Sequence, residues 1–332
     1  MGAAERPAGP RTAAPRTAAP RPAAPRPAGP RPAGLLASRA EAPPAPPVRR
    51  PAAVLRPHIV NYTGFDTRFT APRRRLELPT GFVTLVFTFD DGLWVTRGAE
   101  LATARLRPAA ASRALIGGPR TGPVLGVHAG AVHGLEVNMS PLGAHRLFGV
   151  PMAHFGQGPV DLAEVLGPGG PRLAERLREA DGWEARFELL DSVFAARLDR
   201  GPAASPEVRG ALARLWADTG PGAPARAGAE AGWSARRLRA RFREEVGLPP
   251  KAVARLFRLQ HALRRLAAGT PPAEVAAACG YHDQAHLGRE VKAMTGLPPG
   301  RFATLRGGLP PGSALDRVPG RITSVLLPPP SA

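Results

Sequence analysis

The spacing of apolar residues changes along the chain from an alternating pattern to a helical one. From about residue 57 to 106 it is typical of strands. The alternating faces of "GFVTLVFTFDDGLWV" carry Val83, Leu85, Phe87 and Phe89 on one side and Phe82, Thr84, Val86 and Thr88 on the other. Asp91-Gly92 predicts a hairpin turn before Leu93. The later segment "GPVLGVHAGAVHGLEVNMSP" continues in short β-like pieces divided by glycines, so this half predicts a small β-rich domain.

From residue 141 onward the apolar residues recur every three or four positions. In "RLAERLREADGWEARFELLDSVFAARL" this period predicts two helices divided near Asp181-Gly182. Trp216 is predicted to lie on a further helix that leads into the C-terminal region.

That region contains two similar sequence segments of about 20 residues each. "GWSARRLRARFREEVGLPP" begins at Gly232 and "GYHDQAHLGREVKAMTGLPP" begins at Gly280, with Leu238 matching Leu287 and both segments ending in Gly-Leu-Pro-Pro. The match predicts two copies of one small structural unit.

In the first copy, Ser234 is a good N-cap and Leu238, Phe242 and Val246 form one apolar stripe of a helix that ends at Gly247. The other faces of this helix carry five arginines, at 236, 237, 239, 241 and 243. Such a surface is suited to neutralising phosphates.

In the second copy, Asp283 takes the cap position. Leu287, Val291 and Met294 are predicted to face inward, and Gln284, His286, Arg289 and Lys292 outward. The helix before it, "PPAEVAAACG", turns through Gly280. A helix, a glycine-containing turn and a second helix make a helix-turn-helix unit, whose second helix enters the major groove of DNA.

Between the copies, "PKAVARLFRLQHALRRLAAG" predicts one long linker helix. About 18 residues give a rod of roughly 27 Å. Adjacent major grooves on one face of a duplex lie some 34 Å apart, so the rod favours two units that read successive grooves.

Charge supports double-stranded DNA as the partner. The formal net charge is +19, with +7 in residues 1–50, +2 in 51–225 and +9 in 226–306. Positive charge concentrated in the tail and in the region of the repeat is the pattern expected when these regions face a polyanion.

The first 34 residues repeat "RPAAP"-like units with an Arg every five positions, which predicts disorder. For residues 1–45 three interpretations stay open: a mis-assigned upstream start, a flexible basic arm that binds DNA non-specifically, or an inert extension. No apolar run is long enough for a transmembrane helix, and the tail lacks the apolar region of a secretory signal. The single cysteine, Cys279, fits a reducing cytoplasm.

Two other classes of function remain as alternatives. The first is a metal- or ligand-responsive sensor, because five histidines fall in the middle region and His133 lies three residues before Glu136, although no dense ligand motif appears and we predict no bound metal or cofactor. The second is an enzyme fused to the DNA-binding part, such as a DNA-repair methyl acceptor, which needs an activated thiolate. Cys279, on the apolar side of a helix, is a poor candidate, so we predict no enzyme activity.

With these motifs in place, the segment from about 210 to 306 resembles the DNA-binding domain of AraC-type transcriptional regulators, most specifically in G-Y-x-D-Q-A-H-L followed by G-L-P-P-x-x-F. Residues from about 57 to 200 resemble, more weakly, the N-terminal region of a subset of these regulators. The sequence "PARAGAEAG" lacks the large aliphatic residues usual in the first helix of the first unit, so we expect that helix to be weak.

The resemblance implies a cytoplasmic bacterial transcription factor, active as a monomer or homodimer, with an unidentified small-molecule effector and RNA polymerase as candidate partners and no membrane association. Carried over by position, the base-contacting residues are Arg236, Arg239, Gln284, His286 and Arg289. Phosphate contacts are assigned to Arg237, Arg243 and Lys292. Caps and turns are assigned to Gly232, Ser234, Gly280 and Asp283.

We therefore predict an α+β chain, with a β-rich, sensor-like N-terminal domain followed by an all-α tandem helix-turn-helix domain built on a long linker helix. The predicted boundaries are a disordered tail at 1–50, a β-rich then helical regulatory domain at 51–205, the DNA-binding domain at 206–306 and a disordered C-terminal tail at 307–332.

Overall fold

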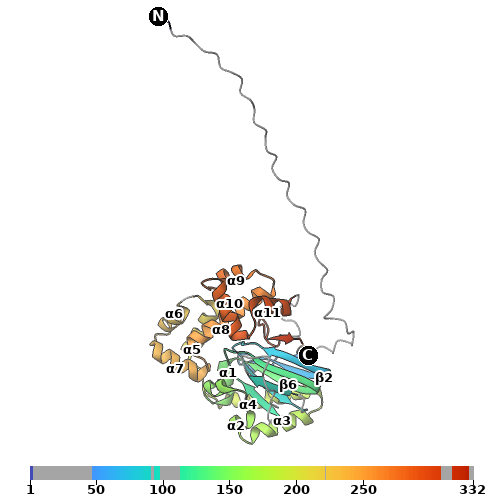
Figure 1. Ribbon diagram of the computed structural model, residues 1–332. Helices are drawn as coiled ribbons and strands as arrows, with labels where there is room; N and C mark the ends of the chain where they lie inside the picture. Colours follow the sequence, from blue (N-terminus) through green and yellow to red (C-terminus); the bar gives the residue numbers. More distant parts are fainter. Residues whose placement is uncertain (3–46, 91–92, 98–112, 221, 308–315, 329–332) are drawn as a thin grey trace. The chain divides into compact units, whose positions relative to one another are not determined.

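The structure, a computed structural model, describes residues 1–2, 47–90, 93–97, 113–220, 222–307 and 316–328 (Figure 1). Internal contacts divide the chain into Met1–Pro43 and Pro44–Ala332. All the helices and strands of the described residues belong to the second unit. The prediction of a disordered N-terminal tail falls on residues 3–46, outside the described part, except at its end.

The strands of the described residues form one antiparallel sheet, with seven strands from the N-terminal half and one from near the C-terminus. Its strands are β1 (Val48–Arg49), β2 (Ile59–Glu77), β3 (Val83–Thr88), β4 (Leu93–Arg97), β5 (Ala114–Gly117), β6 (Val124–Met139), β7 (Val160–Asp161) and β8 (Ser324–Leu327). The order is β1-β2-β6-β3-β5-β7, with β4 paired to β6 and β8 paired to β2. The two long strands β2 and β6 pair with each other along most of their length and form the centre of the sheet.

The predicted hairpin between β3 and β4 is wrong. Both strands pair with β6, from Val83 opposite Met139 to Thr88 opposite Gly134 and then from Leu93 opposite His128 to Arg97 opposite Val124, so they run in the same direction along it. Asp91 and Gly92 themselves lie outside the described residues. Strand β6 has 16 residues, which is long enough to pair with β3 and β4 one after the other.

The predicted alternation of faces in β3 is confirmed, because Val83, Leu85 and Phe87 are buried and the residues between them are only partly so. With Leu135 and Val137 of β6 they form a core against helices on one side of the sheet. These helices are α1 (Pro141–Phe148), α2 (Leu162–Leu166), α3 (Gly169–Glu179) and α4 (Gly182–Leu198), with short 3-10 turns at Ala53–Leu55 and Met152–Gln157. The division between α3 and α4 falls where the sequence predicted it.

A second core holds the C-terminal helices, which Figure 1 shows on the other side of the sheet from α2–α4. They are α5 (Pro206–Ala217), α6 (Ala223–Glu230), α7 (Ala235–Glu245), α8 (Pro250–Ala267), α9 (Pro272–Ala278), α10 (Gln284–Thr295) and α11 (Pro299–Arg306). Trp216 lies on α5 as predicted, and α8 is the 18-residue linker helix. The predicted fold class, a β-rich domain followed by an all-α domain with two helix-turn-helix units, is confirmed.

Both predicted tails need correction where they meet the fold. Val48 and Arg49, assigned to the N-terminal tail, pair with Thr63 and Tyr62 as strand β1. Residues 316–328, assigned to a disordered C-terminal tail, return to the sheet and form β8 against residues 74–77 of β2. Ile322 and Val325 are fully buried in the second core, which explains why this segment is ordered.

The returning segment is also held by polar contacts. Arg306, at the end of α11, and Asp316 form an ion pair of 2.7 Å in which both side chains are fully buried. The buried Gln260 of α8 donates to the carbonyl oxygens of Pro79 and Ile322 and accepts from the Ile322 N–H. One side chain of the linker helix therefore joins the sheet, the helices and the C-terminal segment.

Candidate nucleic-acid interface

Helix α7 is the second helix of the first helix-turn-helix unit. The turn before it contains Gly232, whose φ of +64° favours glycine, and the hydroxyl of Ser234 accepts from the Arg237 N–H as the N-cap. Leu238 and Phe242 are buried in the core. Arg236, Arg237, Arg239 and Arg243 are exposed, so the positions assigned to bases and phosphates all lie at the surface.

The helix before it, α6, forms in spite of its composition. Pro224 lies in the first turn, where a missing N–H is tolerated. A Cβ on Gly228 would lie 3.4 Å from the Cδ2 of Leu238. This is an ordinary van der Waals distance, so Leu238 of α7 packs against α6 at Gly228.

Helix α10 is the corresponding helix of the second unit. Asp283 is its N-cap and accepts from the His286 N–H at 2.6 Å, while Gly280 in the preceding turn has a φ of +73°. The hydrogen bond from the His286 backbone, together with His282, lowers the pKa of the Asp283 carboxyl group. Leu287, Val291 and Met294 are buried, and Gln284, Arg289 and Lys292 are exposed.

His286 is more constrained than its neighbours on the outer face of α10. Its Nδ1 accepts from the backbone N–H of His282, and its ring lies edge-on to Tyr281 with the centroids 5.3 Å apart. Because Nδ1 is an acceptor, the neutral ring carries its proton on Nε2. The side chain is partly buried, and its neutral ring presents one N–H donor.

Each recognition helix is tied to another helix by a buried glutamate that the sequence analysis did not single out. Glu290 of α10 pairs with Arg255 and Arg258 of α8, at 2.9 and 3.0 Å. Glu245 of α7 accepts from the hydroxyl and the backbone N–H of Ser205, before α5. The only sign of these anchors in the sequence is that Glu245 and Glu290 are acidic residues within a strongly basic segment.

Glu245 also changes the interpretation of the basic face of α7. Arg241, one of its five arginines, pairs with Glu245 at 2.7 Å and Glu244 at 2.8 Å. Its guanidinium is held within the protein, whereas the arginines with assigned DNA contacts are exposed. Arg237 lies over the ring of Trp233, at 4.5 Å from its centroid.

The alternatives of a metal sensor and a thiol enzyme gain no support from the site geometry. His133 lies on the face of β6 that contacts Phe89 and Trp183, and Glu136, an odd number of residues away, lies on the opposite face. Among the described residues, no group of three or more His, Cys, Asp or Glu side chains is placed to hold a metal. Cys279 is buried, and burial raises the pKa of its thiol, which is the opposite of activation.

In the described segments, no helix is both long and apolar enough to cross a lipid bilayer.

Comparison with known proteins agrees with this interface. Residues 228–304, from α6 to α11, match a family model described as a helix-turn-helix domain. The site and the fold define a DNA-binding transcriptional regulator. The matched residues lie within the segment whose sequence resembles the DNA-binding domain of AraC-type regulators.

The solved structures similar to this one share little sequence with it. The structure is similar to ToxT from Vibrio cholerae O395, with 9% sequence identity, a TM-score of 0.41, and coverage of 75% of this chain and 98% of that one. It is similar to unsaturated fatty acid bound wild-type ToxT from Vibrio cholerae strain SCE256, with 9% identity, a TM-score of 0.40, and coverage of 79% and 99%. No curated protein matches the chain in sequence.

Proposed function

We propose that this regulator binds a bipartite DNA site, with α7 and α10 entering two successive major grooves. The observation that carries the proposal is the repetition of one capped, arginine-bearing recognition helix on both sides of the 18-residue helix α8. An 18-residue helix is about 27 Å long, close to the separation of adjacent grooves on one face of a duplex. A single chain carries both units.

In this proposal Arg236 and Arg239 of α7 and Gln284, His286 and Arg289 of α10 contact bases. Arginine suits the O6 and N7 of guanine, and glutamine suits adenine. His286 would use the N–H of Nε2, because its Nδ1 is occupied by the turn. Arg237, Arg243 and Lys292 would bind phosphates and fix the register of the two helices on the duplex.

The capping of both helices supports the same arrangement. The first turn of each recognition helix is fixed by a side-chain cap, Ser234 or Asp283, and the residues assigned to bases begin one or two positions later. In helix-turn-helix proteins the N-terminal part of the recognition helix contacts base edges. Arg236, Gln284 and His286 lie in the first turn of their helices, and Arg239 and Arg289 follow in the second turn.

The test is selection of bound sequences from random duplex DNA by the full chain at two salt concentrations. We expect two short motifs about one helical turn, some 34 Å, apart, and an affinity that falls steeply as salt rises. A single enriched motif would contradict base reading by one of the two units. Salt-sensitive binding without any enriched motif would contradict sequence-specific reading altogether.

A further inference from the structure

The residue that follows the turn glycine is aromatic in both helix-turn-helix units, Trp233 in the first and Tyr281 in the second. The backbone N–H of Trp233 donates to the carbonyl oxygen of Gly228 in α6, and that of Tyr281 donates to Ala276 in α9. Tyr281 is buried in the core of the helices, and Trp233 is partly buried against it. Each turn therefore carries a ring that is joined to the first helix of its unit.

Each ring contacts the same position of the recognition helix that follows it. The guanidinium carbon of Arg237 lies 4.5 Å from the centroid of the Trp233 ring. The ring of His286 lies edge-on to Tyr281, with the centroids 5.3 Å apart. Arg237 and His286 are both the third residue after the cap, and the backbone N–H of each donates to the cap side chain. One position of each helix is therefore held by its backbone and by its side chain.

The second unit has one more residue than the first between the aromatic residue and the cap. This residue is His282, whereas Ser234 follows Trp233 directly. The backbone N–H of His282 donates to Nδ1 of His286 at 3.3 Å. The extra residue therefore adds a polar contact to the contact with Tyr281, and it leaves the Nε2–H of the neutral ring as the donor for a base.

Tyr281 is itself held by the linker helix. The guanidinium carbon of Arg258 in α8 lies 4.9 Å from the centroid of the Tyr281 ring, which is the distance of a cation–π contact. The same guanidinium pairs with Glu290 of α10 at 3.0 Å. A continuous set of contacts therefore joins the anchor between α8 and α10 to the ring that His286 contacts.

Such contacts affect DNA binding through the freedom of the side chain. A side chain that binds DNA loses rotamer freedom, and this loss opposes binding. A side chain that is already held in one orientation loses less. Because the contacts of Arg237 and His286 with aromatic rings use no hydrogen-bond donor, both side chains keep donors for DNA.

We propose that Trp233 and Tyr281 are positioning residues for DNA recognition, which hold Arg237 and His286 in the orientation that binds DNA. The inference rests on the proposed contacts of these two residues with a phosphate and with a base. Phosphates carry no sequence information, whereas bases do. Loss of the Trp233 ring should therefore weaken binding to all duplexes alike, and loss of the Tyr281 ring should weaken discrimination at one base pair.

The first measurement follows the ring of His286 in the full chain without DNA. Relaxation of carbon-13-labelled histidine rings measures their order on the picosecond to nanosecond timescale, and the signal missing from His286→Ala identifies the residue. We expect an ordered ring in the wild type and in Tyr281→Phe, which keeps an aromatic ring, and a more mobile one in Tyr281→Leu. A ring that is equally ordered in Tyr281→Leu would overturn the proposal.

The second measurement compares the affinity of the full chain for the selected duplex and for the duplex changed at the base pair where His286→Ala loses its preference. We expect Tyr281→Leu to lose roughly fivefold or more of that preference, and Tyr281→Phe to keep it. The double variant of Tyr281→Leu with His286→Ala should match His286→Ala, because the ring acts through the histidine. A further loss in the double variant would contradict this role.

Failure of this inference and failure of the proposed function give different results. Lost preference in His286→Ala with unchanged preference in Tyr281→Leu would overturn the positioning role alone. Full preference at every base pair in His286→Ala would overturn the base contact, and with it the effect of Tyr281 on base reading.

Met294→Ala separates positioning from a purely structural role of Tyr281. Met294 is buried in α10 and belongs to the same core, so its truncation leaves a cavity there. We expect a lower melting temperature in Met294→Ala and in Tyr281→Leu, but lost base preference only in Tyr281→Leu. An equal loss of preference in both variants would mean that the ring contributes only to folding.

The first unit is tested with Trp233→Leu, which replaces the ring by an apolar side chain. We expect its affinity for the selected duplex and for random duplexes to fall by the same factor, about two- to fivefold. Adding Arg237→Ala to it should give the affinity of Arg237→Ala alone. Additive losses would show that Trp233 does not act through Arg237, contrary to the proposal.

Discussion

The arginines of the two recognition helices, which the sequence alone does not distinguish, have different surroundings in the structure. Arg241 is paired with two glutamates, Arg237 lies over Trp233, and Arg236, Arg239 and Arg289 are exposed. Only an arginine that is free to leave its place can reach a base edge without breaking an internal contact. The surroundings therefore support the residues assigned to bases and set Arg241 apart from them.

Arg289→Ala tests base reading at the scale of one residue. We expect a loss of about 1 to 3 kcal/mol at the selected site and relaxed specificity at one base pair, because a bidentate contact to guanine would be removed. Fluorescence anisotropy on the selected and on random duplexes measures both quantities. Arg172→Ala, at an exposed arginine of α3, is the matched control for loss of one charge. An equal loss on random DNA would show that Arg289 contacts only phosphate.

At the scale of elements, the direction of each recognition helix depends on a helix outside its own repeat. Glu290 fixes α10 on α8, and Glu245 fixes α7 on the start of α5. The repeat in the sequence predicted the two helices, their caps and their buried faces. It did not predict these anchors, because the two glutamates stand at different positions of the repeat and their partners lie 32 to 40 residues away.

Glu290→Gln is expected to lower the free energy of unfolding by about 2 kcal/mol, since two partly buried guanidinium groups lose their carboxylate. Urea unfolding measures this loss. DNA affinity should fall as well, because α10 loses its fixed position on α8. Glu188→Gln, which neutralises an exposed carboxylate of α4, is the control and should change neither quantity appreciably. Wild-type stability in Glu290→Gln would mean that apolar packing alone positions α10.

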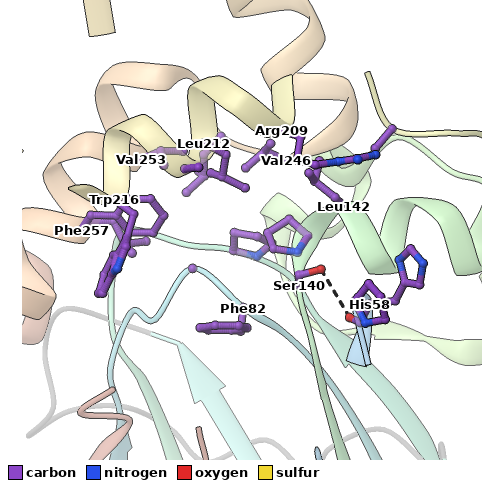
Figure 2. A pocket seen from close by; sticks show the side chains of 18 of the residues that line it. His58, Phe82, Ser140, Leu142, Arg209, Leu212, Trp216, Val246, Val253 and Phe257 are labelled. Atoms are coloured by element: carbon purple, nitrogen blue, oxygen red, sulfur yellow. Dashed lines mark hydrogen bonds between the residues drawn. The ribbon is translucent and has the colours of Figure 1, made fainter. Parts of the chain in front are cut away.

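At the scale of the whole molecule, the C-terminal segment joins the helices to the sheet. Strand β8 extends the sheet beside β2, Ile322 bonds to Gln260 of the linker helix, and Asp316 pairs with Arg306. The same segment supplies Arg321 to the lining of a cavity of about 600 Å³ between the sheet and helices α5 and α8 (Figure 2). The DNA-binding half is therefore connected to the sheet both before α5 and after α11.

Asp316→Ala tests this second connection. Removing one member of a fully buried ion pair is expected to cost about 3 to 5 kcal/mol, because Arg306 would remain buried without its carboxylate. Differential scanning calorimetry should show a lower melting temperature. The double variant Arg306→Met with Asp316→Leu removes both charges and should recover most of the loss. A double variant as unstable as Asp316→Ala would mean that the position tolerates no apolar replacement, contrary to this account.

The sequence by itself determined what depends on neighbouring residues. Apolar periodicity placed the α3–α4 division and the linker helix, cap residues marked the starts of α7 and α10, and the repeat identified two helix-turn-helix units. Hydrogen bonds and side-chain burial within a helix involve residues a few positions apart, so the patterns that predict them lie within short segments of the sequence. Tertiary structure decided the rest. The pairing of both β3 and β4 with β6, the return of residues 316–328 and the position of Arg321 in the cavity all join residues far apart in the chain. Such contacts depend on which surfaces remain to be buried once the helices and strands have formed, and no local pattern records that.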